Sequence, residues 1–120
     1  MASRIQVTID GTVYHAVLGE HPLAEKIVAM CPFTLDYVRS GEHEYYAKLP
    51  EKASAKGCLS TTEGHGNGLY YFEGWNALSL VFRDCNIAPY QIHQIDNFEE
   101  NVSAVLEKLG SNIQILCEAE

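Results

Sequence analysis

Hydrophobic and polar residues alternate at the beginning of the chain, as they do in a β-strand with one buried face. Residues 5–9 read Ile-Gln-Val-Thr-Ile, which is a period of two. Asp10-Gly11 follows, and these residue types adopt the positive φ angles of a tight hairpin turn. The segment 12–18 is expected to return as the second strand. The pattern therefore predicts a β-hairpin over residues 5–18.

A short helix is expected next, over residues 22–30. Pro22 suits the first helical position, where its missing N–H costs nothing. Leu23, Ile27 and Met30 fall on one face of such a helix. The Cys31-Pro32 dipeptide then ends the element.

Short strands separated by turns are expected through the middle of the chain. Alternation predicts strands at 33–39 and 44–49, joined by a turn at Ser40-Gly41. The segment 51–67 is polar and punctuated by glycine, and within it only Cys58-Leu59 favours a short strand. A loop of this length in a small domain is more often functional or mobile than neutral.

Three further strands are predicted, at 68–72, 77–82 and 90–95. Glu73-Gly74 supplies the turn between the first two. Ser79 is the only polar residue of the segment 77–82, so that strand is expected to be buried on both faces.

A capped helix and a last strand are expected to close the chain. Asn97, with Glu100 three residues later, matches a capping box. The apolar stripe that follows predicts a helix at about 98–109, and Gly110 ends it. The segment 112–118 alternates again and predicts the final strand.

About eight short strands with two helices predict a mainly β protein. The arrangement favoured by this order is a closed β-barrel whose open ends are covered by the helices at about 22–30 and 98–109. The sequence shows no internal repeat or linker, so residues 1–120 are expected to form a single domain. Side chains fill a barrel of this size, and function is therefore expected on its outer wall or rim.

Composition and charge narrow the classes of function. Hydrophobic residues make up 47% and charged residues 20%, which is typical of a globular protein. Sixteen acidic residues against eight basic ones give a formal net charge of −8. Nucleic acids and anionic membranes require clustered Lys and Arg, so neither is expected as a partner. The first residues carry no apolar leader, and no segment is long enough to span a bilayer. A cytoplasmic protein is the resulting expectation.

The four cysteines offer no recognised metal or redox motif. They contain no CxxC pair, and in a cytoplasmic protein they are expected to be reduced, small core residues. Their positions are Cys31, Cys58, Cys85 and Cys117. No cofactor, metal site or catalytic constellation is expected anywhere in the chain.

Several segments together resemble the cyclophilin-like proteins, and more narrowly the small bacterial and archaeal families that are distinct from true prolyl isomerases. The resemblance runs along nearly the whole chain. It is carried by the hairpin 5–18, Cys31-Pro32, Glu44-Tyr45-Tyr46 before Leu49-Pro50, Gly68-Leu69-Tyr70-Tyr71 before Ala77–Phe82, Ile92-His93-Gln94-Ile95 and Ile113-Gln114-Ile115. It implies the cyclophilin barrel.

The resemblance does not extend to the catalytic motif of the prolyl isomerases. In those enzymes an arginine directs its guanidinium at the twisting X–Pro amide and favours the transition state. That arginine is followed by a phenylalanine, a glutamine and paired glycines. The corresponding segment 46–68 contains no arginine and no Gln-Gly-Gly. Efficient isomerase activity is therefore not expected.

Five residues are the candidates for a ligand-binding surface. Aromatic side chains would line an apolar groove, an arginine would hold a carboxylate or a peptide carbonyl, and a histidine would lie beside them. Each also has a structural interpretation: the aromatics as core and rim, the arginine in an ion pair, the histidine as a satisfied strand residue. The five are Trp75, Phe82, Arg83, Tyr90 and His93, supplemented by the loop 51–67.

Three functions remain open at this point. The favoured one is binding of a small molecule or short peptide on the barrel wall, without efficient isomerase activity. The alternative is a diverged peptidyl-prolyl cis-trans isomerase that uses Arg83 in place of the missing arginine. The third is a structural module in which the aromatics form the interface of a homo-oligomer.

Overall fold

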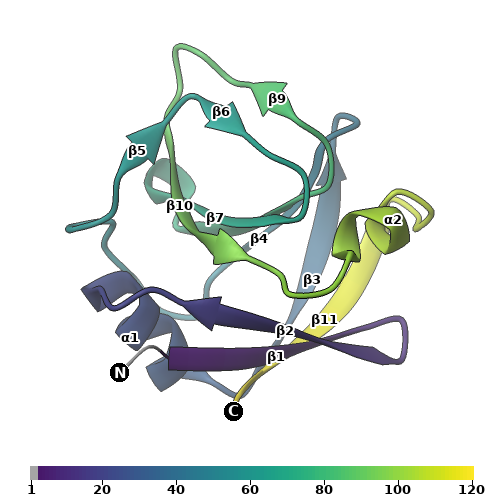
Figure 1. Ribbon diagram of the computed structural model, residues 1–120, viewed down its shortest axis with the longest axis horizontal. Coiled ribbons are helices and arrows are strands. Elements are labelled where there is room, and N and C mark those ends of the chain that lie inside the picture. Colours follow the sequence, from purple (N-terminus) through teal and green to yellow (C-terminus); the bar gives the residue numbers. More distant parts are fainter. Residues whose placement is uncertain (1–2) are drawn as a thin grey trace.

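The alternating segments form the strands of a curled, mainly β fold (Figure 1). The computed structural model describes residues 3–120. The strands are β1 (Ser3–Ile9), β2 (Thr12–Leu18), β3 (Phe33–Ser40), β4 (Glu44–Lys48), β5 (Ser60–Thr61), β6 (Glu63–Gly64), β7 (Gly68–Phe72), β8 (Ala77–Val81), β9 (Cys85–Asn86), β10 (Ile92–Asn97) and β11 (Asn112–Ala119). The helices are α1 (Pro22–Met30), α2 (Val102–Leu106) and the short 3-10 turn η1 (Glu73–Trp75).

Nine of these strands belong to one antiparallel sheet. Its order is β2-β1-β11-β3-β4-β8-β7-β10-β5, and β6 pairs with β9 in a separate two-stranded sheet. The last strand, β11, lies between β1 and β3, with Ile5 opposite Ala119. The N- and C-terminal segments therefore lie side by side (Figure 1). The predicted mainly β class is confirmed.

The sheet curls toward a barrel, but its strand pairing does not close, so the expected closed barrel is not confirmed. β10 pairs with β5 through Ile92 and His93, and only the end of the β10 segment meets β2. That meeting consists of an isolated bridge between Ala16 and Phe98 and a hydrogen bond of 2.9 Å from the Glu99 amide to the His15 carbonyl. One bridge is not a ladder, and the sheet stays open at this seam.

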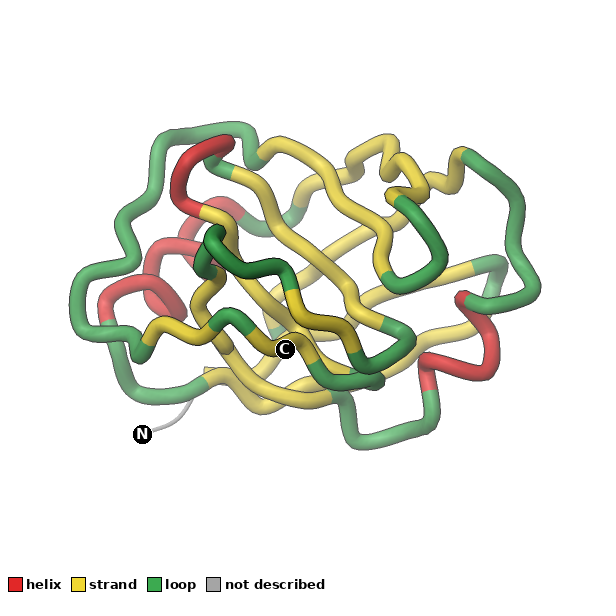
Figure 2. Tube along the Cα trace, turned by 90° about the horizontal axis from the view of Figure 1, so that it is seen from above, coloured by secondary structure: helices red, strands yellow, loops and turns green. Residues whose placement is uncertain are grey.

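The opening hairpin and the first helix form where the sequence predicts them. Asp10 and Gly11 have φ angles of 50° and 82°, the left-handed values that a two-residue turn requires. The helix α1 spans residues 22–30, and the His21 side chain caps it by accepting a hydrogen bond of 3.1 Å from the Ala24 amide. Figure 2 shows α1 and α2 at opposite ends of the sheet.

The second helix is shorter than predicted. It begins at Val102 rather than near residue 98, and its N-cap is Asn101 instead of Asn97. The reason is a competition for backbone groups. The Phe98 amide donates to the Asn67 carbonyl at 3.0 Å, and the Glu99 amide donates across the seam to β2. These bonds hold residues 98 and 99 in an extended path.

The other predicted strands form with small differences at their ends. The loop 51–67 contains β5 and β6, which lie beyond the expected Cys58-Leu59 segment. The connection after β8 contains β9, and Tyr90 precedes β10 instead of beginning it. No helix in the described part of the chain is long and apolar enough to cross a bilayer.

Strands β7 and β8 are buried on both faces because two clusters cover them. Their inward residues, such as Leu69, Leu78 and Leu80, join the main core inside the curl. On the outer face a second cluster forms from Tyr70, Val81 and Ile92, with Phe72, Cys85 and Ile87 packed against it. All five residues of β8 are buried, which confirms the interpretation of that strand.

The small β6–β9 sheet packs tightly around Gly64. A Cβ atom on Gly64 would lie 3.0 Å from the Cys85 sulfur and 3.5 Å from the Ile92 and Val81 side chains. Carbon atoms in van der Waals contact prefer about 3.5–4.0 Å. Glycine at this position therefore lets the β6–β9 sheet lie against the outer cluster and cover part of the wall.

Candidate functional site

The uncovered part of the outer wall is hollowed into a groove of about 430 Å³. Its position follows from strand alternation. On β4, Tyr45 and Ala47 are buried in the core, so Glu44 and Tyr46 face outward. Small residues on β8 form the floor. The groove is lined by Ser40, His43, Glu44, Tyr46, Phe72, Trp75, Ala77, Ser79, Ile87, Tyr90 and Ile92.

Four aromatic rings form the wall of the groove. Phe72 lies edge-on to Trp75, with ring centroids 5.1 Å apart and planes at 87°. It also lies edge-on to Tyr90 at 6.4 Å, and Tyr46 contacts Trp75 at 5.5 Å. Edge-to-face geometry is favourable between aromatic rings. Even so, Trp75 and Tyr90 are 60% and 65% exposed, so two large apolar rings are held open to solvent.

The turn before β8 holds Trp75 in this position. Residues 73–75 form η1, and Asn76 follows with a φ angle of 50°. Asn76 is itself buried. Its Oδ1 accepts hydrogen bonds from the Ala53 amide at 3.0 Å and from the Tyr71 hydroxyl at 2.6 Å. Its Nδ2 donates to the Glu51 carbonyl at 2.9 Å. The chain reverses tightly here, and the indole points outward.

The floor of the groove carries a hydrogen-bonded polar group. The buried Ser79 hydroxyl donates to Glu44 Oε1 at 2.9 Å, and His43 Nε2 lies 3.0 Å from Glu44 Oε2. Both carboxylate oxygens therefore have a partner within the protein. The arrangement can offer a polar contact to a ligand, but it holds no nucleophile next to a free base.

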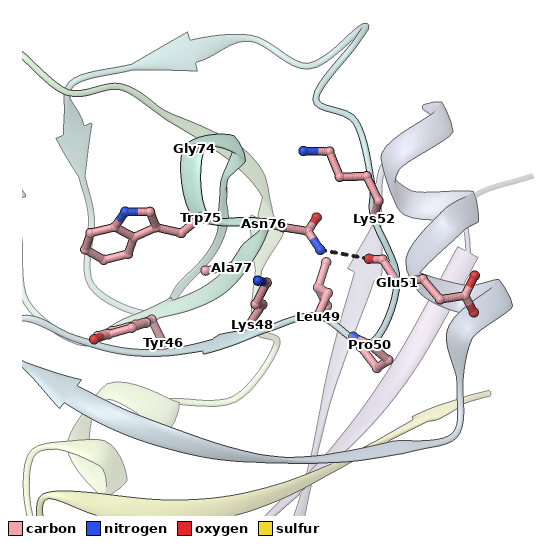
Figure 3. Close-up of a pocket in the computed structure, with 10 residues that line it drawn as sticks. All are labelled: Tyr46, Lys48, Leu49, Pro50, Glu51, Lys52, Gly74, Trp75, Asn76 and Ala77. Carbon is pink, nitrogen blue, oxygen red and sulfur yellow. Dashed lines mark hydrogen bonds between the residues drawn. The ribbon is translucent and has the colours of Figure 1, made fainter.

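A second cavity, of about 720 Å³, adjoins the groove at Trp75 (Figure 3). We call it the cleft. It shares Tyr46, Trp75 and Ala77 with the groove, and it is completed by Lys48, Leu49, Pro50, Glu51, Lys52, Gly74 and Asn76. Figure 3 shows Lys48 and Lys52 on two sides of the cleft, while the Glu51 carboxylate points away from it. The loop 51–67 thus contributes Glu51 and Lys52 to this region.

The structure brings two of the five predicted site residues into the groove, Trp75 and Tyr90. Phe82 is 3% exposed and belongs to the core. Arg83 is exposed and pairs with Glu107 at 2.6 Å and with Glu42 at 3.5 Å. His93 lies on β10 with Nδ1 at 3.3 Å from the Cys58 carbonyl. None of the last three lines either cavity, and binding by the five residues together stays a prediction.

Sequence reasoning missed the residues on β4. Tyr46 and Lys48 line the cavities, and the signal for them was strand parity: with Tyr45 and Ala47 inward, residues 44, 46 and 48 face outward. Asn76 was also missed. A signal existed there too, because asparagine tolerates the left-handed region and stands directly before a buried strand.

The thiols of Cys85 and Cys58 are not activated. Burial raises the pKa of Cys85, and the Gly64 amide lowers it by less. Burial also raises the pKa of Cys58. A reactive cysteine needs a lowered pKa, so neither is suited to nucleophilic catalysis. Within residues 3–120, no group of three or more His, Cys, Asp or Glu side chains is placed to hold a metal ion.

The buried tyrosine behind the groove has a structural role. The Tyr70 hydroxyl accepts a hydrogen bond of 2.9 Å from the His65 amide, and burial raises the pKa of Tyr70. A phenol with a raised pKa stays neutral at physiological pH. The ring therefore fixes the 65–70 segment against the outer cluster.

Comparisons with known proteins identify a solved structure with a similar fold and a matching protein family. A solved structure, the solution structure of a hypothetical protein from Archaeoglobus fulgidus, resembles it over 99% of this chain and 95% of that one, with a TM-score of 0.76 and 13% identity. A likeness at this identity shows the fold alone. A comparison with curated proteins found no match. The model of the cyclophilin-like family matches residues 7–118, and the chain therefore belongs to the cyclophilin-like family.

Proposed function

We propose that this protein binds a small ligand with an aromatic or apolar group in the groove on its outer wall, without efficient prolyl isomerase activity. The observation that carries the proposal is the pair of exposed rings, Trp75 and Tyr90, held in place by Phe72 around a hollow of about 430 Å³. Small-molecule sites usually measure about 300–1,000 Å³ and combine aromatic walls with a few polar groups. The groove fits both criteria.

The energetic argument is that a ligand would cover apolar surface that the fold leaves wet. Burial of apolar area contributes roughly 25 cal/mol per Å², and a well-placed aromatic contact adds about 0.5–1.5 kcal/mol. The edge-to-face contacts of Phe72 with Trp75 and Tyr90 fix the two rings before a ligand arrives. Such preorganisation lowers the entropic cost of binding.

The isomerase alternative is less well supported. It requires a guanidinium beside a proline-sized pocket, but Arg83 is engaged by Glu107 and Glu42 outside the groove. Arg39 is also committed, because it stacks on Phe82 at 4.6 Å and donates to carbonyls at the end of α2. Among the described residues, no arginine lines the groove or the cleft.

The oligomer alternative predicts a different surface. An interface module should present a flat aromatic patch, whereas Trp75 and Tyr90 border a concave one.

We place the binding function in the cytoplasm, a reducing compartment in which the four free cysteines persist as thiols.

The test uses the indole N–H signal of Trp75, the only tryptophan of the chain, in proton–nitrogen NMR spectra. Titration with benzamide, a neutral aromatic probe, should shift this signal saturably at millimolar concentration. Tyr90→Ala should weaken the binding severalfold. Leu59→Ala is the matched control, because Leu59 is 89% exposed and lies outside the groove. Equal effects of the two variants would contradict the proposed site.

A proline-containing tetrapeptide should be titrated in parallel. Saturable binding of the peptide without faster exchange between its cis and trans forms would reassign the ligand to a peptide. Accelerated exchange would instead support the isomerase alternative. Sedimentation at several protein concentrations tests the third function, a homo-oligomer interface. A dimer in which benzamide no longer shifts the Trp75 signal would support that function.

A further inference from the structure

We infer that the cleft beside Trp75 recognises an anionic group, so that the ligand of this protein is an aromatic carboxylate. The inference rests on the proposed function, because it assigns the charged end of the ligand that the groove would hold. Lys48 and Lys52 would bind the carboxylate in the cleft. The aromatic ring would lie against Trp75, on the boundary that the cleft shares with the groove.

The first argument is charge. The chain has twice as many acidic as basic residues, and Lys26 is neutralised by Glu51 at 2.9 Å. Lys48 and Lys52 differ from it. In the part of the chain that the structure describes, neither has a carboxylate within 4.0 Å. Because Lys26 occupies the Glu51 carboxylate, the cleft has a locally positive lining.

The second argument is that the segment bearing Lys52 is fixed. The Leu49 amide donates to the Asn76 carbonyl at 2.9 Å. The Asn76 side chain then holds the Glu51 carbonyl and the Ala53 amide on either side of Lys52. Lys48 stands on β4, in register with Ala77 of β8. Both ammonium groups therefore extend from anchored backbone, and Figure 3 shows them on two sides of one space.

The third argument is orientation. The groove side of Trp75 carries the Glu44 carboxylate, whose oxygens contact Ser79 and His43. A ligand carboxylate in the groove would meet this like charge, which is unfavourable in a partly buried site. In the cleft it would meet two ammonium groups instead. The two cavities thus differ in sign, and this difference directs the anionic end of a ligand toward Lys48 and Lys52.

The test compares benzoate with benzamide, which match in shape and differ in charge. Both are titrated by NMR against the wild type, Lys48→Gln, Lys52→Gln, the double variant and Lys108→Gln. Lys108 is the control, because it is exposed and lies outside both cavities. Two ammonium groups near the protein surface should favour benzoate by about tenfold. The ratio should fall toward one in the double variant, fall partway in each single variant and remain unchanged in Lys108→Gln.

The two probes separate the inference from the function on which it rests. If benzamide binds at Trp75 and benzoate binds equally well, the anion site is refuted and the proposed groove stands. The same conclusion holds if the benzoate preference survives in the double variant, or if Lys108→Gln abolishes it equally. If neither probe shifts the Trp75 signal at millimolar concentration, both the proposed function and the anion site are refuted. A higher salt concentration should also reduce the benzoate preference, because exposed charges are screened.

Discussion

The buried asparagine behind Trp75 gives the sharpest prediction about stability. Asn76→Ala removes the acceptor of the Ala53 amide and the donor to the Glu51 carbonyl. It also removes the acceptor that the Tyr71 hydroxyl contacts at 2.6 Å. The Tyr71 hydroxyl keeps a second acceptor, the Ala53 carbonyl at 3.0 Å. The buried Ala53 amide has no other hydrogen-bond acceptor among the described residues. The substitution therefore leaves a backbone donor without a partner.

The expected loss follows from two separable effects. A buried donor or acceptor left unsatisfied costs about 1–3 kcal/mol. Asn76 also has a φ of 50°, and a residue with a Cβ atom in the left-handed region costs roughly 1–2 kcal/mol when it lacks the side-chain hydrogen bonds of asparagine. We therefore expect Asn76→Ala to lower the free energy of unfolding by about 3 kcal/mol. Asn76→Gly incurs only the first effect, because glycine has no Cβ atom and tolerates the left-handed region, and it should lose about 1 kcal/mol less.

Urea unfolding followed by circular dichroism measures both variants. Asn112→Ala is the control, because Asn112 is exposed at the beginning of β11 and should change stability by less than about 0.5 kcal/mol. A loss below about 1 kcal/mol for Asn76→Ala would refute the claim that these hydrogen bonds hold the turn. Equal losses for the alanine and glycine variants would refute the backbone argument. Tyr71→Phe completes a double-mutant cycle with Asn76→Ala and measures the coupling between the two side chains.

Three further predictions concern groups outside the groove. Hydrogen bonding to His15 lowers the pKa of Glu100, so the stability from this pair is complete above the ordinary value of 4.5 and is lost as pH falls through the lower folded-state pKa. The unfolding midpoint of the wild type should therefore fall more steeply with acid than that of Glu100→Gln. A hydrogen bond with Cys117, at 3.6 Å, lowers the pKa of Cys31. Iodoacetamide should therefore modify Cys31 before the other thiols, and it should modify Cys31 more slowly in Cys117→Ala. Mass spectrometry measures both rates. Arg83→Ala should leave X–Pro exchange at the rate measured with the wild type. It should also change the free energy of unfolding by less than about 1 kcal/mol, because exposed ion pairs contribute little. If the wild type accelerates X–Pro exchange and Arg83→Ala abolishes the acceleration, the proposed function is overturned.

Local pattern was sufficient wherever neighbouring residues decide the structure. Asp10-Gly11 sets its own turn, and α1 begins at Pro22 and ends before Cys31 because the residues at both ends act locally. The second helix and the barrel seam were not predictable in this way. Phe98 hydrogen-bonds to Asn67, a partner 31 residues away. A capping-box pattern carries no information about such a competitor.

The candidate site shows the same division between local and distant effects. Residues 77–82 are apolar on both faces, so their hydrophobicity alone did not distinguish the inward Phe82 from outward neighbours. The distinction comes from pairing, which places Leu78 and Leu80 in the core and Phe82 with them. Arg83 presents a different difficulty. Its partner Glu107 lies just after α2, and only the folded chain brings them together.

The groove exists because the outer wall is covered unevenly. On β8 the outward residues are Ala77, Ser79 and Val81, and the β6–β9 sheet covers only the last of them, through the cluster that contains Val81. Ala77 and Ser79 are too small to fill the space that remains, and both lie on the floor of the groove. The curled sheet therefore supplies the wall. The η1 turn and the segment before β10 supply the two exposed rings of the groove, because Trp75 and Tyr90 come from these connections. Ligand preference should accordingly follow changes in these connections more closely than changes in the sheet.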